Sequence, residues 1–197
     1  MKKQINELLL QALETEMGGV QIYTTAVTCA VNHDLKEEWQ KYLEQTTHHV
    51  EVVQGVFEKL GLDPQEETPG RLIVRHIGES LVRAIKMAIE AGDSKAAEVV
   101  ACECVVLAET KDHLNWALLS ELASQSRGKE AKTLTEACEE VEEQEDEHLY
   151  HTKGWCRELW IASLGMPAVL PPPEEEKDVK TAIGAARAEK AREEMLA

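Results

Sequence analysis

The chain has 197 residues, which is enough for one domain with a sizeable hydrophobic core. Only 4% of the residues are aromatic, while Ala, Leu, Val and Glu are frequent and Gly and Pro are confined to a few points, which favours long helices over sheets. The 37 acidic and 21 basic residues give a net charge of −16, which argues against nucleic acid and anionic membranes as partners. This charge fits a protein that attracts cations, but an acidic surface more often serves solubility alone.

The sequence also carries signals about its compartment. No segment approaches the length of about 18 apolar residues that a membrane-spanning helix needs, and the N-terminus lacks the continuous apolar run of a secretory signal. The five cysteines form no Cys-x-x-Cys repeat and lie in apolar segments, so we expect buried free thiols in a reducing compartment. These cysteines are Cys29, Cys102, Cys104, Cys138 and Cys156. The sequence therefore predicts a soluble cytoplasmic protein.

The first helix is predicted over about residues 4–31, where apolar residues recur at steps of three and four. Glu16 lies within this apolar stripe, and Tyr23 follows two turns later on the same side. A carboxylate on a buried helix face costs several kcal/mol unless something pairs with it. Glu16 is therefore either a candidate ligand or a solvated residue at the edge of the stripe.

The second helix is predicted over about residues 34–60. Asp34 and Glu37 are spaced as a capping box at its start, and Gly61 is the expected stop.

Two lines of side chains run along this second helix. The apolar line includes His49, and the more polar line beside it carries Gln45 and His48. After a proline-containing loop, a crossover helix is predicted over about residues 70–91.

The next long helix is predicted over about residues 94–126. Glu109 and Asp112 stand three residues apart on one of its apolar faces, with Trp116 one turn further on. Two carboxylates this close repel each other unless one takes up a proton or a cation lies between them.

The last long helix is predicted over about residues 129–164. Glu145 interrupts its apolar stripe, and His148 follows one turn later at the edge of that stripe. A Glu-x-x-His pair projects both side chains from one helix face, which is the spacing that a metal ion in a helix bundle requires.

These elements place one domain over residues 1–165 and a tail over residues 166–197. The tail begins with a stiff, charged linker of three prolines and three glutamates at 171–176. An Ala-rich stretch at about 178–196 is predicted to form a short helix. The sequence leaves open whether this helix docks on another subunit or stays mobile.

The two halves of the chain repeat the same pattern. Leaving the crossover helix aside, the helices at 4–31 and 94–126 each carry a Glu with an aromatic residue seven positions later. The helices at 34–60 and 129–164 each carry a Gln or Glu with a His three positions later. The matched pairs are Glu16 and Tyr23 with Glu109 and Trp116, and Gln45 and His48 with Glu145 and His148.

A four-helix bundle with a Glu from two helices and Glu-x-x-His from the other two is the arrangement of the ferritin-like di-iron superfamily, which this chain resembles. The added Asp112 resembles the rubrerythrin-type branch, and residues 42–46 and 93–116 resemble the YciF-like bacterial stress proteins, which also have a helical crossover. The resemblance covers about residues 5–160. It implies an all-α fold: an up-down, ferritin-like four-helix bundle with a helical crossover between helices 2 and 3 and a C-terminal tail.

The resemblance also implies a non-haem site with two Fe ions, with Mn or Zn as alternatives. Its metal ligands would be Glu16, His48, Glu109, Asp112, Glu145 and His148. Glu109 and Glu145 would bridge the two metals, and each His would bind one of them. Tyr23 is the predicted catalytic residue, as a hydrogen-bond donor to the site.

One position departs from the family pattern, because Gln45 stands where the family has Glu. Glu44 or Glu51 would substitute only with a changed geometry. In a shifted register, His49 would replace His48. The sequence therefore leaves open whether the site holds two metals, one metal or none.

Three functions follow from these alternatives. The first is a di-iron peroxidase or oxidase that reacts with O2 or H2O2 and takes electrons from a separate donor, since the chain has no Cys-x-x-Cys pair. The second is iron sequestration. The third is a non-enzymatic helical stress protein with a degenerate metal site. A homodimer or higher homo-oligomer is expected in every case. The helices at 34–60 and 94–126 each carry two apolar faces, and a face that the bundle does not use can pack against another subunit.

Overall fold

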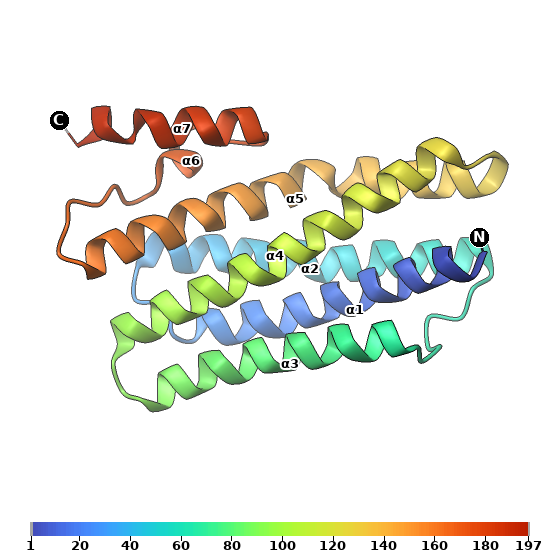
Figure 1. Ribbon diagram of the computed structural model, residues 1–197, viewed down its shortest axis with the longest axis horizontal. Helices are drawn as coiled ribbons and strands as arrows, with labels where there is room; N and C mark the ends of the chain where they lie inside the picture. The colour runs from blue at the N-terminus through green and yellow to red at the C-terminus, as the bar shows by residue number, and fades with distance from the viewer. Residues whose placement is uncertain (1, 197) are drawn as a thin grey trace.

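The computed structural model describes residues 2–196, and over this range the protein is helical, without strands. The helices are α1 (Lys2–Val27), α2 (His33–Leu60), α3 (Pro69–Glu90), α4 (Ser94–Gln125), α5 (Gly128–Ser163), α6 (Pro173–Glu176) and α7 (Ala182–Met195) (Figure 1). The predicted all-α class is confirmed. The ends of the five long helices fall within about one turn of their predicted positions.

The cap of α2 differs from the prediction. The side chain of Asn32 accepts hydrogen bonds from the backbone N of Asp34 at 2.9 Å and of Leu35 at 3.1 Å. Asp34 therefore lies inside the first turn, and the predicted capping box with Glu37 is wrong. Gly61 ends the helix as predicted, with φ of 69°, a left-handed conformation that glycine adopts without steric cost.

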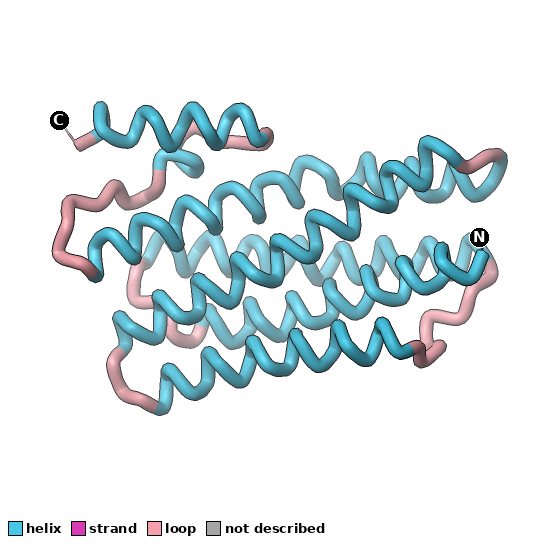
Figure 2. The backbone as a smooth tube through the Cα atoms, viewed as in Figure 1, coloured by secondary structure: helices cyan, strands magenta, loops and turns pink. Residues whose placement is uncertain are grey.

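Four long helices surround a common interior. α1 and α5 each contact both α2 and α4, and helices that are neighbours in this ring run antiparallel (Figures 1 and 2). α3 packs outside the ring against α1 and α4 and carries the chain from the end of α2 back to the start of α4. Within residues 2–196, no helix combines the length and the apolar character needed to cross a membrane.

The hydrophobic core is divided into two clusters along the helix axes. One cluster contains Leu13 and Phe57 together with other residues near the start of α1 and the end of α2. The other contains Ile22, Trp39 and Trp155, which come from the opposite ends of those helices and from the second half of α5. The middle turns of the four ring helices therefore lie between two apolar layers that exclude bulk water.

The tail docks on its own chain, against α5. Buried Glu158 accepts hydrogen bonds from Arg192 Nε at 2.7 Å and from the backbone N of Val169 at 2.8 Å. Glu174 pairs with two nitrogens of Arg157 at 2.7 and 2.9 Å. Burial alone would raise the pKa of Glu158, but these donors hold that pKa below its ordinary value. Charged hydrogen bonds thus attach the segment after α5.

Gly154 provides a direct test of this docking. A Cβ atom there would lie 2.5 Å from Oε2 of Glu174 and 3.0 Å from Cβ of Pro172. We expect Gly154→Ala to push Glu174 away from Arg157 and release the tail. The helical gain of about 1 kcal/mol should be cancelled by an overpacking cost of about 1–3 kcal/mol. Protease cleavage between α5 and α7 should become faster, and urea unfolding should show no gain in stability.

Gly55→Ala is the matched control. Gly55 lies within α2, and a Cβ there would meet nothing within 4 Å. This substitution should stabilise the protein by roughly 0.5–1 kcal/mol through helix propensity alone. Equal gains at both glycines, with unchanged cleavage, would show that the tail does not rest on Gly154.

Candidate metal centre

Ionisable side chains from all four ring helices meet in the layer between the two apolar clusters. The i, i+3 pairs of α4 and α5 each project from one helix face toward this layer. Every member retains 4% exposure or less. The members are Glu16 from α1, His49 from α2, Glu109 and Asp112 from α4, and Glu145 and His148 from α5.

Ligand atoms of five of these six residues, all except Glu109, form two groups that share Glu145. One atom each from His49, Glu145 and His148 lies within 4.8 Å of the others, and the same holds for Glu16, Asp112 and Glu145. A first-row metal ion holds nitrogen and oxygen ligands at about 2.0–2.2 Å, so its opposite ligands are about 4.2 Å apart. Small side-chain movements would therefore close either group around an ion.

Several atoms in this layer are buried without a hydrogen-bond partner. They are Glu16 Oε2, Glu109 Oε2, Asp112 Oδ1, Glu145 Oε2 and His148 Nδ1. An unsatisfied buried polar atom costs about 1–3 kcal/mol, and more when it is charged. Such atoms are rare in folded proteins, so a set of them in one layer calls for a specific cause. Divalent cations would satisfy them, and the residues present therefore fit a metal centre.

Two glutamines orient the two histidines alike. His49 Nε2 lies 2.8 Å from Oε1 of Gln144, and His148 Nε2 lies 2.9 Å from Oε1 of Gln45. Because an amide oxygen only accepts, each Nε2 donates to it, and each Nδ1 faces the carboxylates. His49 Nδ1 is 2.9 Å from Oε1 of Glu145. This arrangement fixes the nitrogen that would bind a metal, as outer hydrogen bonds do in known metal sites.

The repeat between the halves of the chain becomes a crosswise set of hydrogen bonds. Tyr23 of α1 donates to Oε1 of Glu109 on α4 at 2.8 Å, and Trp116 of α4 donates to Oε1 of Glu16 on α1 at 2.7 Å. Each Glu is thereby held by the aromatic residue of the other half. The second oxygen of Glu109 lies 3.6 Å from Nδ1 of His148, beside the first ligand group.

The pKa values show that the cluster carries protons when it has no cation. Burial, followed by the charges of Glu16 and Glu145, raises the pKa of Asp112 well above its ordinary value. Burial also raises the pKa of Glu145 to about 7, although a hydrogen bond with His49 opposes this. Burial would lower the pKa of His49, but the carboxylates of Glu145 and Glu16, at 2.9 and 3.7 Å from its Nδ1, outweigh it and raise the pKa to about 11. Metal binding would therefore compete with protons.

The structure corrects the predicted position of one ligand. The side chain of His48 is 49% exposed and pairs with Glu140 on the surface, with Nε2 2.8 Å from Oε1. His49 occupies the interior instead, because the buried face of α2 passes through Tyr42, Thr46 and His49. The structure thus has the shifted register that the sequence left open.

The remaining predicted residues are brought together. Glu16, Glu109, Asp112, Glu145 and His148 all lie in the buried layer, and the hydroxyl of Tyr23 reaches it through Glu109. Gln45 also reaches the layer, as a partner of His148. The role of Gln144 was missed, because nothing in its sequence context indicates that it meets a histidine of α2.

No protein-family model matches this chain, and neither a curated protein nor a solved structure matches it significantly.

Proposed function

We propose that the chain is a ferritin-like non-haem di-metal carboxylate protein that binds two Fe(II) ions and reacts them with O2 or H2O2. The observation that carries this proposal is the meeting of five buried ligand side chains from four helices in two groups that share Glu145, with buried Glu109 beside the first group. A buried set of carboxylates without compensating charge is strongly destabilising. Two cations in these groups would supply that compensation.

The number of charges supports two divalent ions. The layer contains four carboxylates, from Glu16, Glu109, Asp112 and Glu145, and two imidazoles. Four negative charges balance two divalent cations, so the site would be neutral overall when the carboxylates are ionised. A fifth carboxylate at the position of Gln45 would leave an excess negative charge. Gln45 therefore fits a neutral site, in which it orients His148.

Carboxylate and imidazole ligands suit Fe, Mn and Zn rather than softer metals. Bound Fe(II) would supply the electrons that reduce O2 or peroxide. The chain's own residues would shape this chemistry: the two apolar layers exclude bulk water, and the hydroxyl of Tyr23 holds Glu109 in place by donating a hydrogen bond to it. Electrons for further turnovers would come from a separate donor.

The test uses protein purified without chelator and reloaded anaerobically with Fe(II). We expect two Fe per chain, and H2O2 decay at least about tenfold faster than with the same concentration of Fe(II) in buffer, because the bound ions are positioned together. Asp112→Asn is the control, since it removes a ligand of one group while keeping the shape of the side chain. Its peroxide decay should fall toward that of free iron.

Other outcomes would contradict the proposal. Tight metal binding without faster peroxide or O2 consumption would indicate sequestration. Protein that takes up no metal after reloading would indicate a helical protein whose buried layer is held by protons instead.

A further inference from the structure

We propose that the pocket between α4 and α5 is the route by which divalent cations reach the buried ligand layer; this inference rests on the proposed function. The ligands are almost fully buried, so an ion needs an opening between helices. α3 covers the side of the ring formed by α1 and α4, and the tail helices α6 and α7 cover part of α5. The pocket lies at neither of these covered places.

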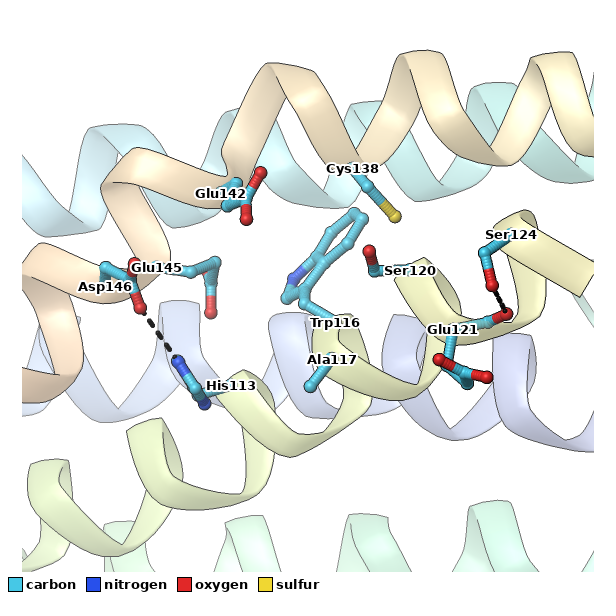
Figure 3. A pocket seen from close by; sticks show the side chains of 10 residues that line it. All are labelled: His113, Trp116, Ala117, Ser120, Glu121, Ser124, Cys138, Glu142, Glu145 and Asp146. Carbon is cyan, nitrogen blue, oxygen red and sulfur yellow. Dashed lines mark hydrogen bonds and ion pairs between the residues drawn. The ribbon is translucent and has the colours of Figure 1, made fainter. Parts of the chain in front are cut away.

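The pocket extends from exposed side chains down to a member of the ligand layer. Its volume is about 360 Å³. Glu121 and Glu142 lie at its exposed rim, while buried Trp116, Cys138 and Glu145 form its floor (Figure 3). Six water molecules occupy roughly 180 Å³ in the liquid, so a divalent ion fits inside with its hydration shell.

Glu145 connects this pocket to the metal centre. Its side chain is about 3% exposed, and its Oε2 has no hydrogen-bond partner in the part of the chain that the structure describes. The same residue belongs to both ligand groups. An ion at the floor of the pocket would therefore meet first the carboxylate that the two metal positions share.

The charge of the pocket selects cations. Four of its ten lining residues are acidic, and none is Lys or Arg. A cleft lined by one sign of charge raises the local concentration of oppositely charged ions and the rate at which they arrive. Anions would be repelled by the same field.

One hydrogen bond spans the pocket close to the ligands. His113 Nε2 of α4 lies 2.9 Å from Oδ1 of Asp146 of α5, and Figure 3 shows this contact beside Glu145. His113 follows Asp112 in the chain, and Asp146 follows Glu145. An imidazole and a carboxylate can bind an ion in transit, so separation of this pair would both open the route and provide temporary ligands.

The test is the rate at which metal-free protein takes up Co(II), followed by stopped-flow absorption. Glu142→Gln should slow uptake about threefold or more at low ionic strength, and the difference should shrink as salt is added. Ser120→Trp, which fills the rim, should slow it further. Neither variant touches a ligand, so the dissociation constant should stay within about twofold of the wild type. Glu139→Gln is the matched control, because it removes the same charge from the exposed surface of α5 outside the pocket.

The possible failures are distinguishable. Wild-type uptake rates in both pocket variants, with normal binding at equilibrium, would overturn the route and leave the metal centre intact. Equal slowing by Glu142→Gln and Glu139→Gln would assign the effect to net charge and also overturn the route. Absence of equilibrium binding in the wild type would overturn both the route and the proposed function.

Discussion

Glu145→Gln should abolish binding at both metal positions, whereas substitutions that affect one ligand group should spare the other. Glu145 belongs to both groups, His148 to the first and Asp112 to the second. Loss of an outer hydrogen bond already costs about 10–100-fold in metal affinity, so loss of the shared ligand should cost more than about 100-fold at each position. His148→Gln and Asp112→Asn should each retain one ion.

Anaerobic titration with Co(II), combined with elemental analysis after gel filtration, would measure these losses. His48→Gln is the matched control, since His48 is half exposed and pairs with Glu140. It should bind metal like the wild type, while His49→Gln should lose the ion of the first group. If Glu145→Gln still binds two ions, Glu145 is not a ligand shared by both positions. If His48→Gln loses an ion and His49→Gln does not, the assignment of His49 to the buried face of α2 is wrong.

Metal affinity should also rise steeply with pH. Cations compete with protons for Glu145, whose pKa is raised to about 7 chiefly by burial, and for His49, whose pKa is raised to about 11 by Glu145 and Glu16 against the effect of burial. Each displaced proton can change the affinity by up to about tenfold per pH unit. Competition titrations between about pH 5.5 and about pH 8.5 should show affinity increasing throughout.

Metal affinity should rise with pH, but the same two groups should make the stability of the metal-free protein fall with pH. A raised folded pKa means that the folded state binds the proton more tightly, so the stabilisation is complete below the unfolded pKa and is lost as pH rises through the folded pKa. For Glu145 this window runs from 4.5 to about 7, and for His49 from 6.5 to about 11. The free energy of unfolding should therefore fall with rising pH when chelator is present.

Thermal melts with chelator and with saturating metal would test this linkage. The difference in Tm between the two conditions should widen from acid to mildly alkaline pH, because metal stabilises the folded state more as its affinity grows. The comparison cancels the contribution of the acidic surface, which both samples share. Parallel curves would show that the buried groups exchange no protons with a metal.

Much of the site could be predicted from the sequence, because helical periodicity shows which residues share one face of a helix. Glu16, Glu109 and Glu145 each interrupt an apolar stripe, and the structure buries all three. The choice between His48 and His49 was harder. These neighbours are about 100° apart around the helix, and the x-x-His repeat favoured His48, whereas the apolar stripe of α2 contains His49.

Contacts between distant segments could not be predicted in this way. Gln45 meets His148 across 103 positions, and Gln144 meets His49 across 95. Such pairs depend on the rotation and axial shift of whole helices, to which local periodicity is insensitive. The docking of the tail on α5 likewise depends on Glu158. Nothing in the sequence distinguishes Glu158 from the other glutamates, and only the fold places Arg192 beside it.

The sequence by itself determined that this protein is built from long helices and that several of them carry an acidic residue on a buried face, since both properties follow from the local spacing of apolar and charged side chains. Only the tertiary structure decided which histidine faces inward, how the glutamines orient the imidazoles and where a pocket reaches Glu145. Those features depend on the packing of four helices against one another, and that packing is settled by the sum of many weak contacts between residues far apart in the chain.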